Sequence, residues 1–167
     1  GDARRLALQQ ATHKAGKRLV PWAGCAAPLL SEGEGSPSAE GGGEGLAFCF
    51  LPLPLRTGLP VHVNGYFELS SNRRDLWHGD DLSEGSGQLR VQWNGALLRD
   101  GVAPLYADLL RAAAAQLGPS AAFYALWPLQ DGVVEPWATM VAVTFRLLAP
   151  MAVLWVEGPG GGRWAPP

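Results

Sequence analysis

The sequence predicts an α+β fold in which two or three helices pack against a small, mostly antiparallel sheet. Residues 46–69 hold an apolar run interrupted by prolines and then an alternating apolar–polar segment, a pattern typical of short neighbouring strands. Residues 88–117 and 136–149 repeat apolar side chains every three or four positions, as helices with one buried face do. A short apolar segment at 152–156 is a further candidate strand for the same sheet.

The first expected element is a helix over residues 2–18, where Leu6 and regularly spaced alanines form a stripe. Val20 precedes a proline and is therefore disfavoured in helical conformation, so the helix should end there. Residues 31–45 are rich in Gly, Ser and Glu and lack aromatic residues, which predicts a disordered acidic loop. The expected parts are the helix and its connection (1–30), the loop (31–45), the α+β segment (46–157) and a flexible tail (158–167).

Two strands are expected in the central segment. Residues 46–51 suit a buried strand, and Pro52 and Pro54 cannot donate to a neighbouring strand. The strand should therefore end at these prolines or lie at the edge of the sheet. Residues 61–69 form the next strand region, in which Asn64–Gly65 could make a tight hairpin turn or a bulge.

Two helices should cover the sheet. The helix at 88–117 contains Gly101 and Pro104, which predict a kink or a break, and Gly118 should end it. Pro136 is suited to the first position of the second helix, where its missing N–H costs nothing.

Composition excludes several classes of function. The net charge is −2 and the pI is near 5.9, so the chain lacks the basic surface of a nucleic-acid-binding domain. It has no apolar run long enough to span a bilayer, and no phosphate-binding loop or nucleophile-elbow motif. The two cysteines, Cys25 and Cys49, are isolated and predicted to be free thiols in a reducing compartment. We therefore expect a cytoplasmic protein that is not an enzyme by itself and holds no cofactor or metal.

One polar segment is a candidate anion site. It follows a strand and places small polar side chains before two adjacent arginines, whose guanidinium groups offer several donors to a phosphate. The residues of this site are Ser70, Ser71, Asn72, Arg73 and Arg74. The alternative is a polar turn whose arginines pair with Asp75, Asp80 or Asp81.

Histidines give weaker candidates. His78, Asp80 and Asp81 could form a metal cluster, but a solvated loop explains them better because further ligands are missing nearby. A stand-alone enzyme that uses His62, His78 and the aspartates is a rival reading that a hydrolase screen would test.

Three consecutive motifs carry a family resemblance. They are Ala-Phe-Cys-Phe-Leu-Pro-Leu-Pro at 47–54, Thr-Gly-Leu-Pro-Val-His-Val-Asn-Gly-Tyr-Phe at 57–67, and Ser-Ser-Asn-Arg-Arg-Asp at 70–75. With Trp77, these motifs resemble the sacsin family. They are similar to the segment of its repeating region that follows an ATP-binding fold related to the ninety-kilodalton heat-shock chaperone. The resemblance continues through Trp93–Asn94 and at 103–106, 126–128 and 135–137.

The resemblance implies a chaperone or co-chaperone function in cytoplasmic protein quality control. Its expected partners are an adjacent ATP-binding domain of the same parent chain and chaperone clients or other chaperones, and ATP and Mg²⁺ would bind in that adjacent domain. Residues 69–74 resemble a Leu-Asn-x-Ser-Arg-Glu motif of the heat-shock chaperone, which places Arg73 at the position of an arginine that reaches the ATP γ-phosphate. This sequence departs from the motif at Asn72 and Arg74. The alternative is a structural protein-interaction module without any nucleotide role.

Overall fold

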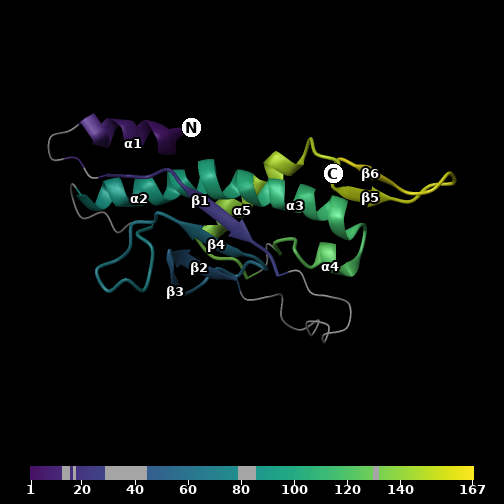
Figure 1. The fold of residues 1–167 in the computed structure, drawn as a ribbon, viewed down its shortest axis with the longest axis horizontal. Coiled ribbons are helices and arrows are strands. Elements are labelled where there is room, and N and C mark those ends of the chain that lie inside the picture. The colour runs from purple at the N-terminus through teal and green to yellow at the C-terminus, as the bar shows by residue number, and fades with distance from the viewer. Residues whose placement is uncertain (13–15, 17, 29–44, 79–85, 130–131) are drawn as a thin grey trace.

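The computed structural model of the chain describes residues 1–12, 16, 18–28, 45–78, 86–129 and 132–167. It shows an α+β arrangement with a four-stranded sheet in one layer and helices in the other (Figure 1). The expected fold class is therefore confirmed. The predicted acidic loop at 31–45 lies almost wholly outside the described residues.

The four strands are arranged in the order β1–β4–β2–β3. Their bounds are Ala23–Ala26 for β1, Leu46–Cys49 for β2, Leu51–Arg56 for β3 and His62–Gly65 for β4. The central pair, β2 and β4, is parallel, and the two outer pairs are antiparallel. Because β3 is an edge strand, Pro52 and Pro54 are tolerated there, which confirms one of the two positions expected for them.

The long helical segment is continuous, and its geometry changes at the place where its sequence predicted a kink or a break. It consists of α2 (Ser86–Leu97), a π-helical turn η1 (Leu98–Val102) and α3 (Ala103–Leu117). The wider π turn includes Gly101 and ends two residues before Pro104, so the missing proline N–H is accommodated at the first turn of α3. Gly118 ends α3 with a φ of 60°, as its position predicted.

The remaining helices frame this segment. They are α1 (Asp2–Thr12), the short α4 (Ala121–Tyr124) and α5 (Trp137–Leu148). Helix α5 begins directly after Pro136, one residue later than expected, so the proline is the N-cap and not the first helical residue. The prediction for the first helix was too long, because α1 ends at Thr12 and residues 18–20 are not helical. In α1 only Ala3 is buried, so little apolar packing extends this helix.

Two further expectations were wrong. Asn64–Gly65 is neither a turn nor a bulge but the end of β4, and a side chain at Gly65 would collide with Phe67 and Leu97. The candidate strand near 152–156 does form, as β5 (Leu154–Val156), but it does not join the main sheet. It pairs with β6 (Arg163–Ala165) within the tail that was expected to be flexible.

The core lies between the sheet and the α2–α3–α5 layer. Its largest fully buried side chains include Trp93, Tyr106, Phe123 and Trp137. Each such side chain contributes on the order of 1.5–3 kcal/mol by leaving water. The Tyr106 hydroxyl donates to the Leu126 carbonyl at 2.7 Å, and burial raises the pKa of this phenol. The core thus fixes the sheet against α2, the helix that also holds the candidate site.

Candidate functional site

The candidate arginines lie on a hairpin that follows β4. Leu69 and Leu76 form an antiparallel bridge, and the Ser70 N–H donates to the Asp75 carbonyl at 2.9 Å. The Trp77 N–H donates to the Glu68 carbonyl at 3.2 Å. These backbone bonds fold the segment back on itself, so the arginines occupy the tip of an ordered hairpin.

Helix α2 holds the base of this hairpin. The buried carboxamide of Asn94 accepts from the Glu68 N–H at 2.8 Å and donates to the Glu68 carbonyl at 2.8 Å. It also donates to the Trp77 carbonyl at 3.0 Å. The neighbouring Trp93 indole donates to the Tyr66 carbonyl at 2.7 Å. Two consecutive helical residues therefore anchor both ends of the hairpin to the core.

The flanks of the hairpin are braced by Arg90, also on α2. Its guanidinium lies 5.3 Å from the centroid of the Trp77 ring, and its Nε is 3.8 Å from a carboxylate oxygen of Glu68. The Trp77 indole N–H donates to the Leu69 carbonyl at 2.8 Å. The hairpin is thus held against α2 by the hydrogen bonds of the Asn94 carboxamide and by Arg90, which contacts the Trp77 ring and the Glu68 carboxylate.

The polar side chains at the tip are used within the tip itself. The Ser70 hydroxyl donates to the Asn72 carboxamide oxygen at 2.7 Å and accepts from the Asp75 N–H at 3.1 Å. The same Asn72 oxygen accepts from the Arg74 N–H at 3.0 Å, and the Arg73 N–H donates to the Ser70 carbonyl at 2.8 Å. The backbone N–H groups of Arg73, Arg74 and Asp75 are therefore used within the tip, and the two guanidinium groups remain as charged donors for an anion.

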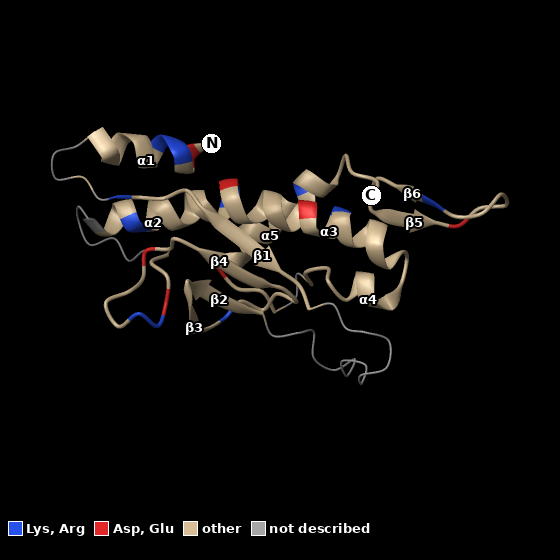
Figure 2. Cartoon of the chain, viewed as in Figure 1, with Lys and Arg blue, Asp and Glu red and all other residues tan. Residues whose placement is uncertain are grey.

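Arg73 and Arg74 are both exposed at the tip, and Figure 2 shows basic residues at the end of this hairpin with acidic ones on its flanks. Among the described residues, neither guanidinium forms an ion pair. The Asp75 carboxylate accepts from the Leu76 N–H at 2.7 Å and lies 4.0 Å from His78. Asp80 and Asp81, the other suggested partners, lie outside the described residues. The described carboxylates therefore leave both arginines available.

Arg73 also has an unusual backbone. Its φ is 55°, in the left-handed region that a residue other than glycine seldom adopts. The bond from the Arg73 N–H to the Ser70 carbonyl closes a turn, and this conformation lets the chain leave that turn into the second flank of the hairpin. The left-handed backbone conformation of Arg73 thus helps to set the direction of its own side chain.

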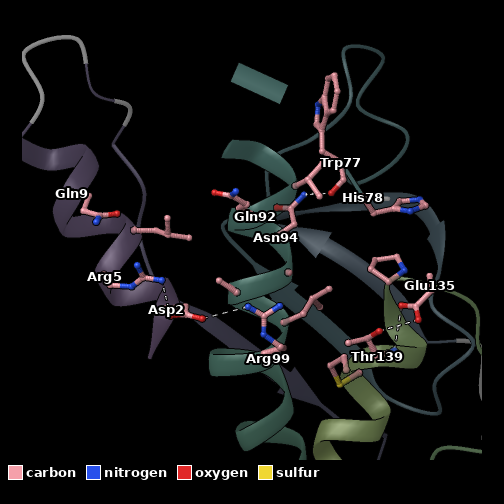
Figure 3. Close-up of a pocket in the computed structure, with 17 residues that line it drawn as sticks. Asp2, Arg5, Gln9, Trp77, His78, Gln92, Asn94, Arg99, Glu135 and Thr139 are labelled. Atoms are coloured by element: carbon pink, nitrogen blue, oxygen red, sulfur yellow. Dashed lines mark hydrogen bonds and ion pairs between the residues drawn. The ribbon is translucent and has the colours of Figure 1, made fainter. Parts of the chain in front are cut away.

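A groove of about 590 Å³ lies beside the base of the hairpin (Figure 3). It is lined by α1, α2, the first residues of η1, the start of α5 and the pair Trp77–His78. Asp2 on α1 is 2.9 Å from Arg5 and 3.6 Å from Arg99. The hydrogen bond and charge of Arg5 lower the pKa of the Asp2 carboxyl. The charges of this wall therefore largely satisfy one another.

The far wall of the groove is similarly satisfied. The Glu135 carboxylate accepts from the Thr139 hydroxyl at 2.8 Å and from the Thr139 N–H at 3.3 Å. Asp100 lies near the groove and accepts from the Ala3 N–H at 2.9 Å, which ties α1 to the π turn. The groove thus offers fewer unpaired charges than the tip of the hairpin.

Of the described histidines, His62 and His78 lie in different surroundings. His62 lies on β4, where its Nδ1 accepts from the Leu46 N–H at 3.1 Å and its ring meets Phe48 edge-on. His78 lines the groove. Among the described residues, no three potential ligands gather around one point as a metal ion would require. The suggested cluster of His78 with Asp80 and Asp81 falls partly outside these residues.

The sequence did not predict that Asn94 anchors the hairpin; this residue was named only as part of the family resemblance. Its one local signal is an amide placed next to Trp93 on the apolar side of a helix, where a buried polar group needs hydrogen-bond partners.

The described helices include none that is both long and apolar enough to cross a bilayer.

The comparisons with known proteins support the resemblance over part of the chain. No family model matches the chain, and no solved structure matches it. A stretch of 64 residues, 38% of this chain, is 55% identical to human sacsin, and the match covers 1% of sacsin's length. Identity at this level over 64 residues shows that the chain contains a sacsin-like region.

Proposed function

We propose that this chain is a non-catalytic segment of a sacsin-like chaperone or co-chaperone in cytoplasmic protein quality control. It couples a neighbouring ATP-binding fold to client or partner contacts and has no complete active site of its own. In this proposal Arg73 reaches a phosphate of the nucleotide that the neighbouring fold holds. The sacsin-like region and the geometry of the hairpin support the proposal.

The observation that carries it is the presentation of Arg73. A long cationic side chain in solvent usually finds a nearby carboxylate or stays on a mobile loop. Arg73 instead stands on a hairpin anchored by three hydrogen bonds to Asn94, and it pairs with no described carboxylate. An arginine positioned in this way suits an anion supplied from outside the described residues.

A guanidinium offers a phosphate several N–H donors in a fixed plane. Contact with the γ-phosphate would stabilise the charge that builds up as the phosphoryl group is transferred. Arginines supplied in this way to other nucleotide hydrolases raise turnover by about 10³–10⁵. Mg²⁺ and the nucleotide would be held by the neighbouring fold, and this chain would contribute the arginine.

The test uses a longer chain that carries both this region and the ATP-binding fold. Arg73→Ala should lower the turnover number for ATP hydrolysis by at least about a hundredfold while ATP affinity changes little, because the contact strengthens in the transition state. Arg73→Lys should restore a small part, because an ammonium keeps the charge without the planar donors. Arg74→Ala is the matched control and should change turnover much less.

Unchanged hydrolysis in the Arg73→Ala chain would refute the phosphate role. So would equal losses in the Arg73→Ala and Arg74→Ala chains, since a merely basic tip would not distinguish the two positions. Failure of the joined domains to bind ATP would favour the second candidate, a structural interaction module. The exposed aromatic side chains of Trp22, Phe50 and Tyr66 favour that module.

A further inference from the structure

Three aromatic side chains form an exposed patch at the end of the sheet that carries the hairpin. Trp22 precedes β1, Phe50 forms the turn between β2 and β3, and Tyr66 directly follows β4. Their exposed fractions are 45%, 54% and 40%. We call these three residues the aromatic patch. Leu51, the residue after Phe50, is 74% exposed.

The patch is assembled by the strand order and not by sequence proximity. Because β4 lies between β1 and β2, the residues at the ends of these strands become neighbours. The ring centroids of Phe50 and Tyr66 are 4.4 Å apart, and those of Trp22 and Phe50 are 6.0 Å apart with nearly parallel planes. Trp22 meets Tyr66 edge-on at 6.5 Å. The three rings therefore make one continuous apolar surface.

The backbone shows that this surface is maintained against strain. Among the described residues, only Phe50 and Arg73 combine a positive φ with a side chain, at 61° and 55°. Glycine would adopt these conformations without the steric conflict. The Phe50 turn is held by a bond from its N–H to the Asn64 carboxamide at 3.2 Å. Strained residues that persist in a fold often serve function.

The hairpin that carries Arg73 begins just after Tyr66, so Arg73 and the aromatic patch lie at the same end of the sheet. Burial raises the pKa of the Cys49 thiol and the Glu68 charge raises it further, whereas a backbone hydrogen bond of Phe67 and the Arg73 charge lower it. Cys49 is the residue immediately before Phe50, so the charges of Glu68 and Arg73 both act at this end of the sheet. The hairpin that follows Tyr66 thus carries an arginine that pairs with no described carboxylate.

We propose that the aromatic patch and Arg73 together bind an extended acidic segment of a partner protein. Proline or leucine side chains of the segment would pack on the three rings, and a carboxylate beside them would pair with Arg73. Tryptophan, tyrosine and arginine are the residues that most often dominate binding energy at protein interfaces. Aromatic surfaces suit extended proline-containing segments, and free guanidinium groups select acidic ones.

The experiment titrates the isotopically labelled chain, without nucleotide, with two pools of short synthetic peptides. One pool combines proline, leucine, aspartate and glutamate in random order, and the other replaces the acidic residues by lysine and arginine. The acidic pool should shift NMR signals of the aromatic patch and the hairpin, and the basic pool should not. Added salt should weaken the binding. This test is independent of the nucleotide role, since ATP is absent.

Phe50→Gly should weaken acidic-peptide binding by about tenfold or more, because it removes the central ring and suits the left-handed turn. Arg73→Gly should remove most of the salt dependence. Leu129→Ala alters an apolar residue, 70% exposed, outside the patch and should leave binding unchanged. If Phe50→Gly does not fold, Trp22→Ser gives the same test at the neighbouring ring.

Four results would overturn the proposal. They are no binding of either pool, equal binding of both pools, shifts confined to another surface, and patch shifts that depend on protein concentration without peptide. The last result would identify a second copy of the chain as the occupant. Loss of ATP hydrolysis in the longer Arg73→Ala chain together with absent peptide binding would leave the proposed function standing and remove only this inference.

Discussion

Replacing Arg73 by glycine should stabilise the fold, whereas the same change at Arg74 should destabilise it. The two residues are adjacent, identical and exposed, and neither pairs with a described carboxylate. They differ in backbone conformation, because Arg73 has a φ of 55° and Arg74 lies outside the left-handed region. The pair therefore isolates the cost of placing an arginine in a glycine-like conformation.

The magnitude follows from two opposing effects. A side chain in the left-handed region costs roughly 1–2 kcal/mol through contact of its Cβ with the backbone. Glycine gives the unfolded chain more freedom, which costs about 0.5–1 kcal/mol. Arg73→Gly should thus raise the free energy of unfolding by about 0.5–1 kcal/mol. Arg74→Gly should lower it by a similar amount because only the second effect applies.

Chemical denaturation of the two variants and the parent chain measures this difference at constant m-value. The two glycine variants should differ by about 1–2 kcal/mol, with the parent between them. Equal destabilisation by both would refute the idea that Arg73 is strained. If Arg73→Gly is more stable yet inactive in the longer chain, the arginine is kept for function at a cost in stability.

Other predictions concern the anchor, the core and the thiols. Asn94→Ala should destabilise the fold by about 2–3 kcal/mol because it leaves buried backbone groups unpaired, and Gln92→Ala on the exposed side of α2 should change thermal unfolding little. Tyr106→Phe should cost about 1 kcal/mol in the same assay because one buried hydrogen bond is lost, and an unchanged midpoint would contradict it. Burial raises the pKa of Cys25 to about 12, so its thiol stays protonated at pH 8 and should react with iodoacetamide more slowly than Cys49, as mass spectrometry of timed samples would show. Faster labelling of Cys25 would contradict its burial. Because the raised pKa favours the neutral thiol in the folded state, its contribution to stability should be lost as the pH rises from 9 toward 12.

Local signals made much of the fold predictable. Apolar residues at helical spacing located α2, α3 and α5, and Gly118 and Pro136 marked two helix ends because their backbone preferences are strong. Pro52 and Pro54 indicated an edge strand because proline lacks an N–H. In each case the information lies within a few residues of the element.

Features that depend on distant partners were not predictable. The strand β1 has only four small residues, and it forms because β4 is available beside it. The parallel pairing of β2 with β4 brings Phe50 to Tyr66, and nothing in either local sequence specifies that contact. The anchoring of the hairpin by Asn94 likewise joins residues 26 positions apart. The candidate arginines could be named from sequence, but their presentation could not.

The central claim is that Arg73 meets a negative group outside this chain, and an experimental structure tests it most directly. A longer chain containing this region and the ATP-binding fold, bound to Mg²⁺ and a non-hydrolysable ATP analogue, would be solved and the Arg73 guanidinium located. The claim predicts a donor–acceptor distance of about 2.7–2.9 Å between a guanidinium nitrogen and a γ-phosphate oxygen. An Arg73 side chain paired with a carboxylate of its own segment while the nucleotide is bound would contradict it.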